Sequence, residues 1–165
     1  MLQLNLPAYG YKFKQSAEQT QIFDLIRRKY VALTPEEWVR QHFINYLITH
    51  LHYPKGLIAV ERGVTYNTLA KRTDICVYDI NRQPLWLVEC KATEIAITAE
   101  VVKQATLYNK TLAARLVVLT NGIDHFCWQV INKIHIQPLD HIPDYRELAL
   151  WTAGLLLAIF SFSSQ

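Results

Sequence analysis

The chain has 165 residues, of which 51% are hydrophobic, 12% aromatic and 19% charged, and these proportions fit one globular domain with a full core. This composition excludes a disordered chain and a collagen-like or repeat architecture. Seventeen Lys and Arg against fourteen Asp and Glu give a formal charge of +3, which permits a polyanionic partner without requiring one.

The cysteines and the N-terminus indicate the compartment. Cys76, Cys90 and Cys127 are odd in number and form no CxxC pair, so neither a disulfide framework nor a zinc knuckle is expected. The first residues, MLQLNLPAYGYKFK, do not have the basic and then apolar character of a signal peptide. We therefore expect a cytoplasmic protein.

The first elements are an extension and a helix. Residues 1–33 are expected to pack on the core as an N-terminal extension, and residues 21–31 fit a helical period as well as a strand period. The run Thr34-Pro35-Glu36-Glu37 is typical of a capping box, with Thr34 as N-cap and a helix that begins at Pro35. Apolar residues then recur every three or four positions until Tyr53-Pro54-Lys55-Gly56 ends the helix.

Strands dominate the next part of the chain. Three segments rich in β-branched and aromatic residues are expected to be strands, over residues 57–66, 72–80 and 85–92. The polar run Asn81-Arg82-Gln83-Pro84 should join the second and third as a hairpin. A second helix is expected over residues 98–114, and further strands over 115–120, 125–131 and 134–137. This order predicts an α/β domain over residues 34–145 with a mixed central sheet and additions at both ends.

The C-terminus is apolar. Residues 149–162, ALWTAGLLLAIFSF, are fewer than the roughly 20 needed to span a bilayer. A helix from Tyr145 to Phe160 would be apolar nearly all round and must be covered. We expect residues 146–165 to form such a helix and to support a homodimer, with membrane attachment as the alternative.

Three charged residues near strand ends share a face. Glu89 and Lys91 are two positions apart, so their side chains point the same way while Cys90 points the other way. If Ile80 pairs with Leu85 across the turn, Asp74 lies opposite Lys91. A register shift of two residues keeps Asp74 on that face, and a shift of one removes it.

Two carboxylates beside a lysine suit a magnesium ion, which prefers oxygen ligands. The lysine can then orient the attacking water and stabilise charge that develops on a phosphate. The alternative is a solvent-exposed salt bridge at a strand end.

The order of elements with Asp74 and then Glu89-x-Lys91 resembles the PD-(D/E)xK nuclease superfamily, and more narrowly the N-terminal nuclease region of type I restriction enzyme R subunits. The blocks that carry the resemblance run from about Thr34 to Gly122; they are TPEEWVRQHFINYLI, AVERGV, KRTDICVYD, PLWLVECKA, QATLYN and LVVLTNG. Thr73 stands where the superfamily's name has Pro. The chain has no Walker motif and no room for a helicase motor, so we expect a stand-alone nuclease domain.

The resemblance implies a restriction-endonuclease-like core and assigns roles to residues. Asp74 and Glu89 would bind the catalytic Mg²⁺, with Mn²⁺ as a substitute, the Cys90 carbonyl would reach the same ion, and Lys91 would be the catalytic lysine. Glu37 matches an acidic residue that relatives aim at the metal, although the capping box would use the same carboxylate. Gln104 and Tyr108 match a QxxxY element, and an ordinary helical pair is the alternative.

Basic residues near this motif could contact phosphates, although a solvated face is as good an account of them; they are Arg62, Lys71, Arg72, Lys103 and Lys110. The sequence thus predicts a magnesium-dependent endonuclease that hydrolyses DNA phosphodiester bonds in restriction or repair, with DNA and restriction-system subunits as partners. The alternative is a catalytically silent nucleic-acid-binding or assembly module with the same fold.

Overall fold

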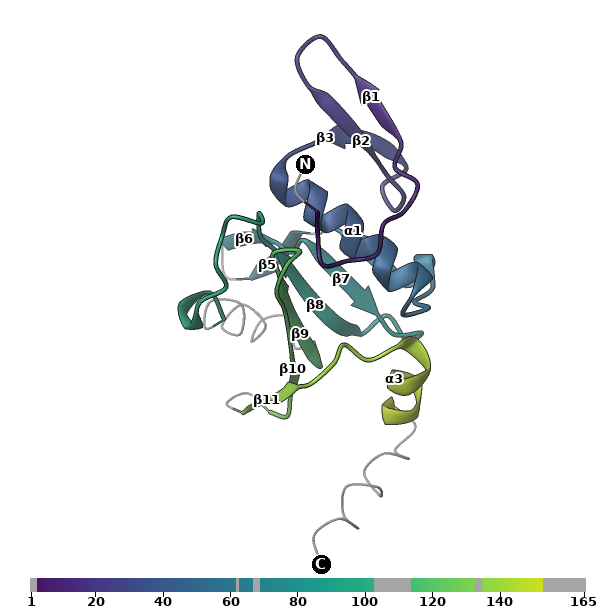
Figure 1. The fold of residues 1–165 in the computed structure, drawn as a ribbon. Helices are drawn as coiled ribbons and strands as arrows, with labels where there is room; N and C mark the ends of the chain where they lie inside the picture. The colour runs from purple at the N-terminus through teal and green to yellow at the C-terminus, as the bar shows by residue number, and fades with distance from the viewer. Residues whose placement is uncertain (1–2, 62, 67–68, 103–113, 133–134, 153–165) are drawn as a thin grey trace, which may run out of the picture.

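A computed structural model describes residues 3–61, 63–66, 69–102, 114–132 and 135–152 (Figure 1). Its centre is a six-stranded sheet in the order β11-β10-β9-β8-β7-β4. The strands are β4 (Ile58–Val60), β7 (Ile75–Tyr78), β8 (Pro84–Cys90), β9 (Leu116–Thr120), β10 (His125–Val130) and β11 (Ile136–Leu139). The β8–β9 pair is parallel and the other pairs are antiparallel, so the predicted mixed sheet is confirmed.

Helix α1 (Pro35–Thr49) begins at the residue that the capping box predicts. The Thr34 hydroxyl accepts the Glu37 amide at 3.0 Å, which satisfies one of the free N–H groups of the first turn. The helix ends at the expected run, where the short 3₁₀ helix η1 (Lys55–Leu57) leads into β4.

The N-terminal segment forms a second, separate sheet. It contains β1 (Phe13–Gln15), β2 (Thr20–Asp24) and β3 (Lys29–Ala32), all antiparallel. Residues 21–31 are therefore two strands joined by a turn, in which Arg28 has a φ of 54°. Figure 1 shows α1 between this sheet and the six-stranded sheet, so the molecule has three layers.

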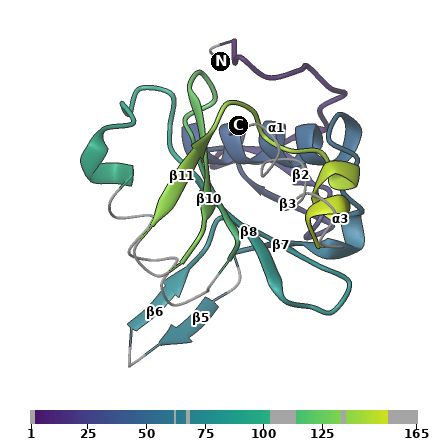
Figure 2. The same cartoon turned by 90° about the horizontal axis from the view of Figure 1, so that it is seen from below.

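The first strand predicted after α1 is two strands in the structure. β4 ends at Val60, Glu61 has a φ of 50°, and β5 (Gly63–Tyr66) then pairs with β6 (Leu69–Arg72) in a separate hairpin. Figure 2 shows this hairpin projecting past the six-stranded sheet. The chain returns to the sheet at β7, which pairs with β4 and β8, so the three-strand meander is β4-β7-β8.

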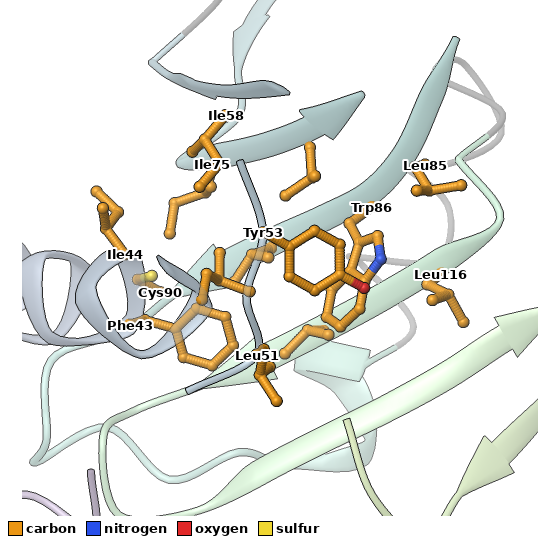
Figure 3. Close-up of a cluster of buried hydrophobic side chains, with 14 of the residues drawn as sticks. Phe43, Ile44, Leu51, Tyr53, Ile58, Ile75, Leu85, Trp86, Cys90 and Leu116 are labelled. Atoms are coloured by element: carbon orange, nitrogen blue, oxygen red, sulfur yellow. The ribbon is translucent and has the colours of Figure 1, made fainter. Parts of the chain in front are cut away.

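The core lies between α1 and the six-stranded sheet. Figure 3 shows Phe43 and Ile44 of α1 facing Trp86 and Cys90 of β8, with Tyr53 beside them. All five side chains are buried. The Cys90 thiol points into this cluster, and burial raises its pKa well above the usual range. Cys90 is thus a small core residue, as its place on the opposite face of β8 predicts.

The connection between β9 and β10 is a tight turn. The Asn121 side chain accepts the amides of Ile123 and Asp124, and Gly122 has a φ of +85°. A Cβ at Gly122 would lie 2.8 Å from the Leu4 side chain, so only glycine fits both the angle and the space. The N-terminal residues are held here, because the Asn5 amide donates to the Gly122 carbonyl.

Two predicted helices are described in part. Residues 99–102 are helical, and the Thr98 hydroxyl caps them at 3.5 Å, but residues 103–113 lie outside the described residues. Helix α3 (Tyr145–Thr152) begins at the predicted residue and buries Leu148 against the core. The rest of the apolar C-terminus lies outside the description, so association through it stays a prediction. No helix among the described residues is long and apolar enough to cross a membrane.

Candidate active site at the ends of β7 and β8

The register of β7 and β8 brings the two predicted carboxylates together. Ile75 pairs with Val88, so continuing the ladder by one residue places Asp74 opposite Glu89. The expected pairing of Asp74 with Lys91 is therefore wrong by two residues. A shift of two residues keeps Asp74 and Glu89 on the same face of the sheet, and Lys91, one residue beyond β8, is close enough for its charge to act on Glu89.

The turn explains the difference in register. Asp79 accepts the amides of Asn81 and Gln83 on one carboxylate oxygen, and its own amide donates to the Gln83 carbonyl. The strands therefore close at Tyr78 and Pro84, with an irregularity between Val77 and Tyr78. A side-chain turn of this kind lengthens the loop that a four-residue polar run predicts.

Asp74 is held from two sides. One carboxylate oxygen accepts the Cys90 amide at 2.7 Å, and the other accepts Nη2 of Arg40 at 2.6 Å. Lys91 continues the chain beyond β8, and its amide donates to the Thr120 carbonyl of β9 at 2.8 Å. The only parallel pair among the described strands thus fixes the backbone beside the candidate site.

Glu89 lies in an unfavourable place for a charged group. Burial, and then the neighbouring Asp74 carboxylate, raise its pKa to about 7, while Lys91 opposes the shift. No residue in the described ranges donates a hydrogen bond to its carboxylate. A cation at this point would relieve the repulsion between the two carboxylates.

The Glu37 carboxylate, which the resemblance aims at the metal, is bound by three side chains. It accepts Arg27 and Arg40, each at 2.5 Å, and Gln41 at 2.7 Å. The return bond of a capping box is replaced too, because the Thr34 amide donates to the Ala32 carbonyl. Glu37 thus belongs to an ion-pair network beside the site.

Glu36 is the carboxylate of α1 that is electrostatically coupled to the site. Burial, and then Asp74, raise its pKa, while Arg40 and Lys91 lower it. Its carboxylate accepts Arg40 at 3.0 Å and its side chain is 44% exposed. Neither Glu36 nor Arg40 was predicted from the sequence to lie at the site, although their i, i+4 spacing on one helix face is a signal for an ion pair.

Arg40 and Arg27 connect the site to the N-terminal sheet. Arg40 contacts Glu37 and Asp74, and its Nη1 lies 3.4 Å from a Glu61 oxygen. Burial lowers the pKa of Arg40, but the Asp74 and Glu37 carboxylates together raise this pKa by more, so it lies above its ordinary value. Arg27, in the turn between β2 and β3, contacts Asp24, Glu37 and Glu61. Ion pairs therefore run without a break from Asp24 to Asp74.

The donor chemistry fits a hard divalent cation. Each Asp74 oxygen accepts one hydrogen bond and keeps a second lone pair for a metal ion. The ion-pair network and the site together also have more carboxylates than cations: the carboxylates are Asp24, Glu36, Glu37, Glu61, Asp74 and Glu89, and the cations are Arg27, Arg40 and Lys91. Within the described ranges, no three His, Cys, Asp or Glu residues form a metal-binding group by themselves. Magnesium commonly takes one or two carboxylates and completes its shell with water and phosphate oxygens.

The other predicted residues are less well placed. Lys71 and Arg72 lie in β6, and nothing is described of their side chains or of Arg62. Lys103, Gln104, Tyr108 and Lys110 lie outside the described residues, so the QxxxY element stays a prediction.

Comparisons with known proteins agree with this part of the chain. A family model described as the type I restriction enzyme R protein N terminus (HSDR_N) matches residues 35–143. The chain belongs to this family. The match of the HSDR_N family covers α1, the whole six-stranded sheet and the candidate site, but not the N-terminal sheet.

A solved structure shares the fold of this HSDR_N chain. It is a fragment described as an HsdR subunit of a type I restriction enzyme from Vibrio vulnificus YJ016, with a TM-score of 0.53 and 18% identity. The likeness covers 74% of the present chain and 26% of that protein, so the chain spans about a quarter of its length. No curated protein matches the chain.

Proposed function

We propose that this chain is a magnesium-dependent nuclease domain of the PD-(D/E)xK type, with a restriction-endonuclease-like core, that hydrolyses DNA phosphodiester bonds. The observation that supports the proposal best is the register of β7 and β8, which brings Asp74 opposite Glu89 at the point where the charge of Lys91 also acts on Glu89. Membership of a restriction-enzyme family supports DNA and other subunits of a restriction system as partners.

Asp74 and Glu89 would hold the Mg²⁺ or Mn²⁺ ion, and the Cys90 carbonyl would complete the protein ligands. When bound, the ion supplies Lewis-acid stabilisation to a phosphate oxygen. Arg40 and the Cys90 amide keep the Asp74 carboxylate in one orientation. Lys91 would orient the attacking water and offset negative charge that develops on the phosphate.

We assign Glu36 the role that the resemblance implies for Glu37. Its coupling to both Asp74 and Lys91 supports this exchange, because Glu37 is already occupied by two arginines. With 44% of its side chain exposed, Glu36 remains accessible to a water molecule of the metal shell.

A cleavage assay tests the proposal. The chain is incubated with single-stranded, duplex and branched DNA in Mg²⁺, in Mn²⁺ and in chelator. Asp74→Asn, Glu89→Gln and Lys91→Met should each reduce cleavage by about 10³-fold or more, because the three groups act as a unit. Glu94→Gln, a charge loss at an exposed residue just beyond the site, is the matched control and should cleave normally.

One observation favours a catalytically silent binding module. Both Asp74 oxygens already accept hydrogen bonds, so Arg40 can serve as the permanent cation of the site. In that case calorimetry would detect no magnesium binding that depends on Asp74 and Glu89, and Lys91→Met would leave every activity unchanged.

A further inference from the structure

The N-terminal sheet has one face on α1 and one face away from it. Ile22 is fully buried, Asp24 accepts Gln41 of α1, and Phe13 stacks on Trp38, so this set of alternating residues faces the helix. The other set forms what we call the outer face: Lys12, Lys14, Gln21, Phe23, Tyr30 and Ala32. In Figure 1 the sheet lies on the far side of α1 from the six-stranded sheet, so the outer face meets solvent.

Two aromatic rings lie side by side on the outer face. Phe23 and Tyr30 are direct partners across β2 and β3, and their ring centroids are 5.3 Å apart. Tyr30 is 39% exposed and Phe23 is half-buried. Since Phe23 and Tyr30 are the aromatic members of this face and no core lies over it, their remaining ring surface is open to a flat apolar partner.

Lysines flank the rings. The Lys12 ammonium lies 5.8 Å from the centroid of Phe23, and Lys14 is exposed on the next outward position of β1. Arg28 and Lys29, in and after the turn that joins β2 to β3, are also exposed. Two of the six outer-face residues are lysines and none is acidic, so the charge that this face carries is positive.

From this surface we propose that the outer face of the N-terminal sheet binds single-stranded nucleic acid, with unpaired bases stacked on Tyr30 and Phe23 and phosphates on Lys12 and Lys14. Aromatic rings amid lysines on an open sheet match both parts of an unpaired strand, which exposes flat bases and a charged backbone. A duplex hides its base faces and would meet this surface through its phosphates alone.

The proposal does not depend on the nuclease assignment. The surface lies in residues 12–32, outside the region that the family model matches, and it uses none of the candidate metal ligands. Binding can therefore be measured in chelator, where cleavage that requires a divalent ion does not occur.

The test uses the full chain and fluorescence anisotropy. The probes are labelled oligothymidylate and oligouridylate of about 15 nucleotides and a duplex of the same length. Tyr30→Ala should weaken single-strand binding by about tenfold, and Tyr30→Phe should restore it, because the ring and not the hydroxyl makes the stack. Phe126→Ala is the matched control, since Phe126 is 43% exposed on β10 and lies in the other sheet.

The lysines have a separate readout. In the double variant Lys12→Glu, Lys14→Glu, the slope of log affinity against log salt should fall by about 0.7 for each phosphate that the protein no longer neutralises. Lys55→Glu, at an exposed lysine of η1, should leave the slope unchanged. Thermal melting establishes that each variant is folded.

Tighter binding of oligothymidylate would indicate DNA as the ligand, and tighter binding of oligouridylate would indicate RNA. Both results support the proposal. It is overturned if the wild-type chain does not bind the single strands, if it prefers the duplex, or if folded Tyr30→Ala binds as tightly as Phe126→Ala.

Discussion

The Arg40 side chain joins three carboxylates at the edge of the candidate site. Its guanidinium contacts Glu36, Glu37 and Asp74 at once while nearly buried. A planar fork can serve several carboxylates in fixed directions, whereas the ammonium of lysine is a single point of charge.

We expect Arg40→Lys to lower the free energy of unfolding by about 2 kcal/mol, because the charge stays but the shorter donor group cannot keep most of the hydrogen bonds. Urea denaturation measures the effect. Arg115→Lys, at an exposed residue before β9, is the control and should change stability by less than about 0.5 kcal/mol. Equal midpoints for the two variants would show that Arg40 acts only as a charge.

Glu36 and Glu37 are neighbours with different roles, and paired substitutions separate them. Glu37→Gln should cost about 2 kcal/mol of stability, because it removes one buried charged partner from each of Arg27 and Arg40. Glu36→Gln should change stability by no more than about 0.5 kcal/mol, since the Glu36 side chain is 44% exposed, and it should lower cleavage. Melting curves and the DNA assay measure both. A stable Glu37→Gln variant that no longer cleaves would return the catalytic role to Glu37.

The N-terminal segment is attached to α1 through a histidine. The His42 Nδ1 lies 2.9 Å from the Trp38 carbonyl, which can only accept, so the proton is on Nδ1 and Nε2 accepts the Tyr11 hydroxyl. Burial lowers the pKa of His42 below its ordinary value. The unfolded chain therefore takes up a proton at a higher pH than the folded chain.

Stability should consequently fall as the pH drops through the ordinary histidine range, about 6.5, toward the lower folded pKa. We expect the wild-type melting temperature to fall more between about pH 8 and about pH 5 than that of His42→Gln. His125, whose pKa is also lowered by burial, titrates in both proteins and cancels in the comparison. Parallel pH profiles would contradict the assignment.

Elements with local signals could be predicted closely. Thr34, Pro35 and the apolar period determine the start of α1, and Asn121-Gly122 determines the end of β9, because the signal and the structure lie within a few residues of each other. The break between β4 and β5 could not be predicted from the sequence, since most of residues 57–66 favour a strand. Gly63 is the one residue typical of turns in this stretch, and the positive φ lies two residues before it, at Glu61.

The part of the candidate site that lies on neighbouring strands could be predicted from the sequence, and the part that comes from other layers could not. Asp74, Glu89 and Lys91 lie in or next to the adjacent strands β7 and β8, so alternation brings them to one face for any register shift of an even number of residues. Arg40, Glu36 and Arg27 reach the site or its network from other layers, and no spacing in the sequence determines which carboxylate each arginine meets. The sequence also gives no sign that Arg27 and Arg40 both bind the Glu37 carboxylate, and the role of Glu37 at a metal stays a prediction.

At the level of the whole chain, the C-terminal helix makes a prediction about assembly. Leu148 buries one side of α3 in the core, and the sequence from Ala149 to Phe162 remains nearly free of polar residues. We expect sedimentation of the detergent-free chain to give a dimer, and a chain that ends at Thr152 to give a monomer. A monomer down to Gln165 would rule out this dimer, and recovery only with membranes would favour attachment.

The ion pairs between Arg27 and Glu37 have a consequence for engineering chimeras. The family match begins at Pro35, which makes a junction there the natural choice for transplanting the nuclease-like module. A chimera with this junction would lack Arg27, whose guanidinium pairs with Glu37 and Glu61. It would also lack Asp24, which pairs with Arg27. The smallest unit that can be transferred to another protein therefore includes the N-terminal sheet. A junction at Pro35 would leave the buried Glu37 carboxylate beside the site without its partner Arg27.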